Sequence, residues 1–331
     1  MNVLIIGFGT IGKIKARVWK SKNLQVLIYD KNRSEEYVGM NKDYAIVSNL
    51  NSIKHVDYID ICTPSGTHVS LLKEILKRRI NFENVLIEKP LFSSFREFSE
   101  FRLLIKRYPQ IIDKLIVSEQ YAFSKILNLN IDKPYKKITI TMSKNRLLDF
   151  KCGRFFDETL GPYGIELPHI IAILRKINVD IASFHSIVNK YFIDPTNIDN
   201  CGVYIEGYTT DVPKIIIKSF LGNYNLDKNL NYKANVTNKE RNLLVENYKN
   251  QWKKIEFDPI KGLPSLTNRI ITNNYQLNLV DNMIDNLISL IIKNQIKSNL
   301  NSIIPDNVLV CELRKHADKV KCLEKYYFNQ R

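Results

Sequence analysis

The segment Gly7-Phe8-Gly9-Thr10-Ile11-Gly12 has the residue types and spacing of a turn that binds pyrophosphate. It follows the apolar run Val3-Leu4-Ile5-Ile6 directly, and a helix-patterned stretch comes next. In this order Gly7 permits the turn, Gly9 lets the backbone approach the phosphates, and Gly12 lets the helix pack closely on the strand. We therefore expect the segment from Gly7 to Gly12 to bind a dinucleotide.

An acidic residue stands where the ribose of such a dinucleotide would lie. The apolar run Val26-Leu27-Ile28-Tyr29 ends in Asp30, eighteen residues after Gly12, and a carboxylate there can accept hydrogen bonds from a ribose. A free 2′-hydroxyl, and hence NAD, is favoured. Lys31 and Arg33 follow at once and could instead hold the 2′-phosphate of NADP, so both cofactors stay open.

Two further turns follow strands that are expected to be neighbours. Cys62-Thr63-Pro64-Ser65-Gly66-Thr67-His68 comes after the fourth apolar run, and Val85-Leu86-Ile87-Glu88-Lys89-Pro90 ends the fifth. Ligands of a parallel sheet lie outside the carboxyl ends of its strands, so Thr63, Pro64, His68, Glu88 and Lys89 are predicted cofactor contacts. His68 could instead cap or pack. Lys89 could donate a hydrogen bond to a hydroxyl or carbonyl oxygen, or be an ordinary surface lysine.

The first third of the chain alternates strands and helices. Apolar runs at Val3–Ile6, Val26–Tyr29, Ala45–Val47, Tyr58–Cys62, Val85–Ile87 and Leu115–Val117 predict strands, with helices that include Val69–Lys77 and Phe95–Lys106. This pattern is typical of α/β proteins with a doubly wound parallel sheet. We predict a dinucleotide-binding Rossmann domain at residues 1–121.

The pattern of apolar and polar residues changes after Gln120. Alternating runs at 137–142, 203–208 and 215–220 predict strands of an open, largely antiparallel sheet, so residues 122–331 are expected to form a C-terminal α+β domain. Helices are predicted from about Tyr163 to Lys176, Tyr275 to Lys297 and Asp306 to Glu324, and the last could pack back on the first domain. Asn223–Asn250 is expected to form long loops.

The amino-acid composition indicates which class of protein this is. The 331 residues are 44% hydrophobic and 25% charged, which is typical of globular proteins, and no apolar run approaches the about 20 residues of a membrane span. The N-terminus resembles a core strand and not a signal peptide, so we expect a cytoplasmic protein. The five cysteines show no spacing for a disulfide framework or zinc.

The formal net charge of +15 has two explanations. Lysines are scattered along the whole chain, with no basic arm or finger motif, so specific nucleic-acid binding is not expected. The charge then reflects either a lysine-rich composition or an anionic substrate, such as a nucleotide-linked sugar.

The Gly7–Gly12, Cys62–His68 and Glu88-Lys89-Pro90 motifs together, in this order and spacing, resemble those of the glucose-fructose oxidoreductase/inositol dehydrogenase (Gfo/Idh/MocA) family. The resemblance implies a Rossmann domain followed by an open α/β domain that binds substrate and mediates oligomerisation. It also implies that Lys89 is catalytic or orients the substrate, and that Lys89-Pro90 is a candidate cis peptide bond.

In this family, the second group of active-site residues usually lies at the start of a helix in the substrate domain. The stretch Gly161–Ala172 matches it in part: the resemblance makes His169 the acid/base, and Glu166, one helical turn earlier, would orient or tune it. Ile165, Pro168 and Ala172 depart from the family pattern. Gln120 and Tyr121 fall where the family lines its sugar pocket, and a plain role at the domain junction is the alternative.

Together with these residues, the family resemblance implies an NAD-dependent oxidoreductase, with NADP as the alternative cofactor, that acts on a secondary alcohol or ketone of a sugar, cyclitol or nucleotide-linked sugar. Lys89, Glu166 and His169 are the predicted catalytic residues, and Lys89, Gln120, Tyr121 and His169 the predicted substrate contacts. No metal is required. A homodimer or homotetramer is expected. The alternatives are a non-catalytic dinucleotide sensor and a reductase of a non-sugar carbonyl or imine.

Overall fold

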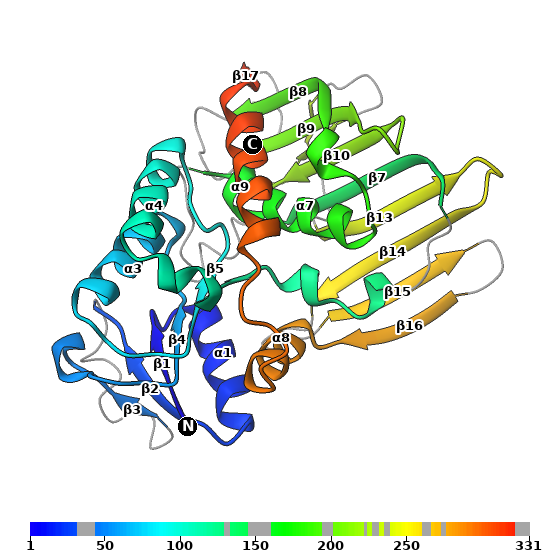
Figure 1. Cartoon of the computed structure of the whole chain (residues 1–331). Coiled ribbons are helices and arrows are strands. Elements are labelled where there is room, and N and C mark those ends of the chain that lie inside the picture. Colours follow the sequence, from blue (N-terminus) through cyan, green and yellow to red (C-terminus); the bar gives the residue numbers. More distant parts are fainter. Residues whose placement is uncertain are drawn as a thin grey trace, which may run out of the picture. The chain divides into compact units, whose positions relative to one another are not determined.

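The computed structural model describes residues 1–31, 44–128, 133–144, 160–193, 201–221, 224–226, 232–234, 239–259, 266–272 and 276–321. These residues form two compact units (Figure 1). The first unit contains Met1–Phe123 and Asn282–Val308, and the second contains Ser124–Pro259, Leu266–Asp281 and the residues after Val308. No helix in the described segments is both long and apolar enough to cross a membrane.

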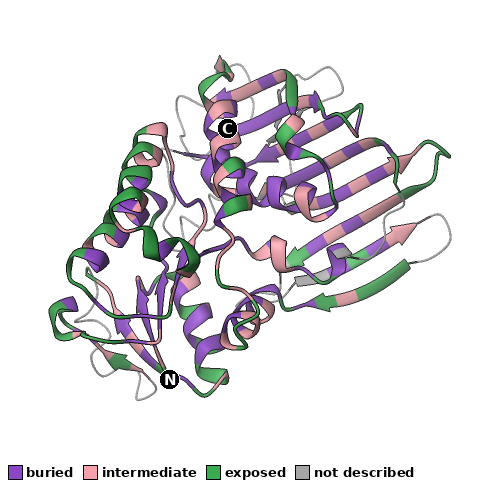
Figure 2. Ribbon diagram, in the orientation of Figure 1, coloured by how far each residue is buried: buried purple, intermediate pink, exposed green. Residues whose placement is uncertain are grey.

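The first unit is built on a parallel sheet, as predicted. Its described strands run in the order β3-β2-β1-β4-β5-β6, and every neighbouring pair is parallel. The central strands are buried because both faces of the sheet are covered, which is the reason for their continuous apolar sequences (Figure 2). The strands are β1 (Asn2–Ile6), β2 (Gln25–Tyr29), β3 (Ala45–Ile46), β4 (Tyr58–Ile61), β5 (Asn84–Glu88) and β6 (Leu115–Ser118).

Helices α1 (Thr10–Ser21), α3 (His68–Lys77) and α4 (Phe95–Arg107) connect these strands. Ser94 caps α4 by accepting from the Glu97 amide, while the Glu97 carboxylate accepts from the Ser93 amide and hydroxyl, so the sequence fixes where this helix begins. A later segment returns to the unit: Asn299 donates to the Val117 carbonyl and accepts from its amide, at 2.9 and 2.8 Å.

The second unit contains the mostly antiparallel sheet that the sequence predicts. Its described strands run in the order β16-β15-β14-β13-β7-β10-β9-β8-β17, and only the β7–β10 and β8–β17 pairs are parallel. Along β10, residues that are fully buried alternate with residues that are half-buried, and Figure 2 shows this alternation on several strands. The strands are β7 (Tyr135–Lys144), β8 (His185–Ile193), β9 (Cys201–Tyr208), β10 (Ile215–Phe220), β13 (Lys239–Asn247), β14 (Trp252–Pro259), β15 (Leu266–Thr272), β16 (Gln276–Asp281) and the short β17 (Asp318–Lys321).

Four predicted elements differ from the structure. The predicted helix from Tyr163 is split into α6 (Pro162–Ile165) and α7 (Leu167–Lys176) at Glu166. The helix predicted over Tyr275–Lys297 was wrong in its first part, because Gln276–Asp281 pairs with β15 as strand β16, and α8 (Met283–Ile292) begins only afterwards. Pairing with a distant strand outweighs local helical periodicity there.

The last predicted helix was also misplaced. Helix α9 (Leu300–Lys315) begins before Pro305, and β17 (Asp318–Lys321) follows it and pairs with β8. The stretch Asn223–Asn250, expected to form long loops that join strands, contains three strands among its described residues: β13, with Leu243 and Val245 buried, and β11 (Tyr224–Leu226), which pairs with β12 (Tyr232–Ala234).

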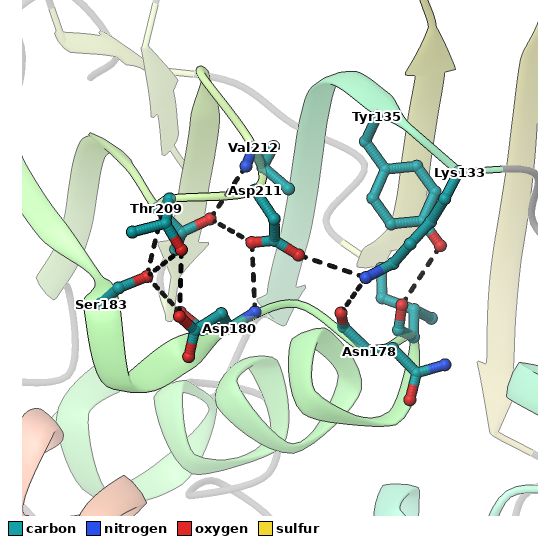
Figure 3. Close-up of polar contacts among 10 residues, drawn as sticks. Lys133, Tyr135, Asn178, Asp180, Ser183, Thr209, Asp211 and Val212 are labelled. Atoms are coloured by element: carbon teal, nitrogen blue, oxygen red, sulfur yellow. Dashed lines mark hydrogen bonds and ion pairs between the residues drawn. The ribbon is translucent and has the colours of Figure 1, made fainter.

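A polar cluster joins the turns at one end of the second unit (Figure 3). The Asp211 carboxylate accepts from the Thr209 hydroxyl at 2.7 Å and from the Asp180 amide at 3.2 Å, and it pairs with Lys133 at 3.1 Å. Lys133 also donates to the Asn178 carbonyl, at the end of α7. Burial alone would raise the pKa of Asp211, but these hydrogen bonds outweigh it and lower the pKa.

We therefore expect Asp211→Asn to destabilise the protein by about 1–3 kcal/mol at pH 7, because the amide cannot replace the charge-assisted bonds. The pKa of Asp211 is lower in the folded state, so its contribution is present above the pKa of the unfolded state and is lost as pH falls through the pKa of the folded state. Urea unfolding at pH 7 and at about pH 3 measures this. A destabilisation that is equal at both pH values would contradict the role given to Asp211.

Candidate functional site

The glycine turn between β1 and α1 has the geometry expected of a phosphate cradle. Gly7 has a φ of +92°, a conformation that favours glycine. A Cβ on Gly12 would lie 2.1 Å from the Gly7 carbonyl oxygen, so only glycine lets α1 pack this closely on the turn. A Cβ on Gly9 would meet none of the described atoms within 4 Å. Since no side chain caps this helix, the amides of its first turn, from Thr10 to Gly12, and the open space at Gly9 fit a pyrophosphate.

Asp30 is tied directly to this turn. Its carboxylate accepts a hydrogen bond from the Phe8 amide at 2.8 Å, at the carboxyl end of β2. Phe8 itself is buried, and Lys31 is exposed. Arg33, the other residue predicted to contact a 2′-phosphate, lies outside the described residues.

The turn after β4 packs against the glycine turn from the other side. The Thr63 methyl would lie 2.8 Å from a Cβ at Gly7, and the Thr63 and Thr67 hydroxyls are 2.7 Å apart. Pro64 is exposed beside them. Thr63 therefore lies against the glycine turn, as a wall of the predicted site would.

His68 is fully buried and links this turn to the one that carries Lys89. Its Nδ1 lies 2.8 Å from the Pro90 carbonyl oxygen, and its Nε2 lies 2.9 Å from the Thr63 carbonyl oxygen. Burial lowers the pKa of His68, although both carbonyl contacts oppose this effect. Both ring nitrogens of His68, which we predicted as a cofactor contact, thus face backbone carbonyls.

The strand-end residue Glu88 is held by a buried lysine that the sequence motifs did not indicate. Lys15, on α1, is completely buried and lies 2.7 Å from Asp60 and 2.8 Å from Glu88. Trp19 donates its indole N–H to Asp60 at 2.9 Å, and the Cys62 thiol lies 3.4 Å from the same carboxylate. This buried polar network therefore joins α1 to the carboxyl ends of β4 and β5.

The residues after Lys89 are fixed as well. The Lys89–Pro90 peptide bond is cis, as predicted, and Lys89 is half-buried. The Leu91 amide donates to the Asn307 side chain of α9 at 2.7 Å, and both residues are buried. Contacts from α1, α3 and α9 thus hold the segment Glu88–Leu91 and, with it, the backbone of Lys89.

The predicted site residues of the second unit lie around the start of α7. Glu166 stands at the break between α6 and α7 and pairs with Arg241 of β13 at 2.6 Å, with both side chains almost fully buried. His169 lies one turn later and is also buried. The sequence did not indicate Arg241, because its partner is seventy-five residues away.

Gln120 and Tyr121 lie in a short 3-10 helix, Gln120–Phe123, directly after β6. Gln120 is half-buried and Tyr121 is buried, and the Tyr121 amide donates to the Glu119 carboxylate at 3.3 Å. Within the described residues, no three His, Cys, Asp or Glu side chains are grouped so that they could hold a metal ion.

The N-terminal residues match a family of enzymes. Residues 1–112 match the model of an oxidoreductase family with an NAD-binding Rossmann fold. That family is Gfo/Idh/MocA, so the resemblance carried by the three motifs is confirmed, and the first unit contains a Rossmann domain of the NAD(P)-binding kind found in that family. None of the curated proteins matches the chain.

Solved structures with the same fold cover nearly the whole chain. KijD10, a 3-ketoreductase from Actinomadura kijaniata solved with NADP and TDP-benzene, is 10% identical, with a TM-score of 0.69 over 98% of this chain and 99% of that one. The UDP-N-acetylglucosamine 3-dehydrogenase GnnA from Acidithiobacillus ferrooxidans is 11% identical, with a TM-score of 0.65 over 96% and 97%. Biliverdin reductase from Synechocystis is 11% identical, with a TM-score of 0.68 over 96% and 98%.

The geometry of the glycine turn predicts different effects for alanine substitutions at Gly9 and Gly12. Gly9→Ala should leave the free energy of unfolding nearly unchanged, because the added methyl group meets open space, but should weaken cofactor binding at least tenfold by occupying the approach of the phosphates. Gly12→Ala should destabilise the protein by about 1–3 kcal/mol, because the methyl group collides with the Gly7 carbonyl. Urea unfolding and nicotinamide fluorescence titration measure the two effects. Unchanged cofactor affinity in Gly9→Ala would exclude the cradle.

Proposed function

We propose that this protein transfers a hydride between a nicotinamide cofactor and a secondary alcohol or ketone of a sugar, cyclitol or nucleotide-linked sugar. The observation that carries the proposal is the position of Lys89. It directly follows β5, at the carboxyl edge of the sheet that also bears the glycine turn, and contacts from three helices fix its backbone. The first unit then binds the cofactor and the second binds the substrate.

NAD is our preferred cofactor, and NADP is the alternative. The Asp30 carboxylate accepts from the Phe8 amide at 2.8 Å, beside the glycine turn, and in our proposal it also accepts from the ribose hydroxyls. Lys31, exposed beside it, supports the alternative, as does KijD10, which was solved with NADP.

The nicotinamide supplies the hydride chemistry when it is bound. In our proposal the Lys89 amine donates a hydrogen bond to the substrate oxygen and stabilises the charge that develops on it. His169 takes up or delivers the hydroxyl proton. Glu166 orients or tunes His169, and the pairing of Glu166 with Arg241 holds its carboxylate in place.

Two similar structures support a nucleotide-linked sugar as substrate, since one is a 3-ketoreductase solved with TDP-benzene and the other a UDP-N-acetylglucosamine 3-dehydrogenase. The net charge of +15 is compatible with an anionic substrate. The likeness to biliverdin reductase favours the second candidate, a reductase of a non-sugar substrate. A homo-oligomer is part of the proposal, because large apolar side chains such as Ile187 and Val280 are 72% and 63% exposed on strands of the second unit.

The test is Lys89→Met with exposed Lys73→Met as the matched control. The reaction is followed by nicotinamide absorbance against a panel of UDP- and TDP-hexoses, their keto forms, inositol and biliverdin. We expect Lys89→Met to lose turnover by at least a thousandfold while the dissociation constant of the cofactor changes less than about threefold, because the lost interaction acts on the reacting oxygen. Lys73→Met should match the parent protein.

Three outcomes would count against the proposal. Full turnover in Lys89→Met would remove Lys89 from the reaction. Cofactor binding without turnover of any compound would favour a dinucleotide sensor. Turnover of biliverdin alone would favour the reductase of a non-sugar substrate.

A further inference from the structure

Asn268, on β15, carries a carboxamide that is buried in the second unit. The residue is only 1% exposed, and neither its amide nitrogen nor its amide oxygen has a hydrogen-bond partner in the part of the chain that the structure describes. Most buried side-chain amides in proteins are hydrogen-bonded, because a buried donor or acceptor without a partner costs stability. This carboxamide can therefore offer two N–H donors and one carbonyl acceptor to a ligand.

Asn189, on β8, shows how a buried carboxamide of the same sheet is used when its role is structural. Its amide nitrogen donates to the Leu313 carbonyl at 2.6 Å, and its amide oxygen accepts from the Tyr163 hydroxyl at 3.3 Å. These bonds join the sheet to the helices packed on it. Asn268 makes no comparable side-chain bonds to the described residues.

Asn268 lies on the same face of the sheet as Arg241. Leu243, Ile255 and Ile270 are register neighbours across β13, β14 and β15, which lie side by side (Figure 1). Arg241 comes two residues before Leu243 and Asn268 two residues before Ile270, and side chains two residues apart on a strand share a face. Arg241 and Asn268 are therefore at the same level of one face, two strands or about 10 Å apart.

This face also holds the predicted site residues of the second unit. Arg241 pairs with Glu166 at 2.6 Å, at the break between α6 and α7, and His169 lies one turn further along α7. Phe257, the register neighbour of Asn268 on β14, is buried as well. The Asn268 carboxamide thus lies on the face against which the start of α7 is held, and all of these residues belong to the second unit.

We propose that Asn268 binds the substrate and determines which substrates are accepted, by hydrogen bonding to two neighbouring hydroxyl groups of a sugar or cyclitol ring. A hydroxyl group both donates and accepts, so a pair of them matches the adjacent N–H and carbonyl of a carboxamide. Because this carboxamide is shielded from bulk water, a ring that lacks one hydroxyl leaves it incompletely paired and binds more weakly. This inference rests on the function proposed above, whose substrate it specifies.

The first measurement requires no substrate. Asn268→Leu replaces the carboxamide by an apolar group of similar size, and thermal unfolding compares this variant with the parent protein. We expect the midpoint to rise by about 2 °C or more, because a buried polar group without a protein partner is removed. The matched control is Asn189→Leu, which should lower the midpoint because it breaks two hydrogen bonds. A lowered midpoint in Asn268→Leu would show that a structural partner, such as a buried water molecule, satisfies the carboxamide, and would overturn the inference.

The second measurement is substrate affinity. Isothermal titration calorimetry compares the same panel of compounds on the parent protein and both variants, each loaded with the redox form of the cofactor that does not react. We expect Asn268→Leu to bind the preferred hexose or cyclitol at least about tenfold more weakly, with less than about a threefold change in cofactor affinity. Asn189→Leu should keep the affinities of the parent protein.

Monodeoxy analogues of that compound then test the hydrogen bonds themselves. Removal of one of the two recognised hydroxyl groups should weaken binding to the parent protein at least about tenfold, and binding to Asn268→Leu less than about threefold. A structural role of Asn268 would not change this ratio. Equal losses in the two proteins would contradict the assignment to hydroxyl groups.

The remaining outcomes separate this inference from the proposed function. Equal substrate affinities in Asn268→Leu and the parent protein would overturn the inference alone, if turnover still depends on Lys89. Loss of affinity for biliverdin alone would assign the carboxamide to a lactam group and overturn its assignment to a sugar. If hexose binding depends on Asn268 but no compound is turned over, the proposed function fails and this inference stands. If no compound binds, both fail.

Discussion

The contact that the first unit depends on most is the approach of α1 to the turn after β1. A Cβ at Gly12 would lie 2.1 Å from the Gly7 carbonyl oxygen, so the helix can occupy this position only without a side chain there. The approach has two consequences. It directs the first-turn amides of α1 to the carboxyl edge of the sheet, and it brings Lys15, one turn further along, within 2.8 Å of carboxylates on β4 and β5. The geometry of the proposed phosphate-binding turn and the pairing of Glu88 with Lys15 therefore share one steric cause.

Burying Lys15, Asp60 and Glu88 is costly, since the desolvation of such charges often exceeds the attraction between them and apolar residues of similar volume would often give a more stable protein. The network ties α1 to the carboxyl ends of β4 and β5, where the proposed site lies. The segment that carries Lys89 is held by Lys15 through Glu88, by His68 through Pro90 and by Asn307 through Leu91. Each of these side chains lies on a different helix, so the amine is presented from a backbone that the fold restrains on several sides.

The sequence predicts those elements of the protein whose conformation is determined by residues close together in the chain. Apolar runs such as Val85–Ile87 predict strands because a parallel sheet is buried on both faces, and Gly7–Gly12 and Glu88-Lys89-Pro90 are short enough to be recognised directly. Strand β16 could not be predicted, because pairing with β15 decides its conformation. The same holds for Arg241, whose partner Glu166 is remote in sequence. The sequence could have indicated that Lys15 has a buried partner. Lys15 shares the buried face of α1 with Gly12, Ala16, Val18 and Trp19, where an unpaired lysine would not be tolerated.

The proposed chemistry requires an amine from the first unit and an imidazole from the second to reach the same bound molecule. A crystal structure of the protein with NADH or NADPH and a substrate or keto-sugar analogue measures this directly. We predict that the Lys89 Nζ and a ring nitrogen of His169 both lie within about 3.2 Å of the same substrate, at the oxygen of the reacting carbon. If the two groups point apart, so that no single bound molecule touches both, the proposed mechanism is wrong.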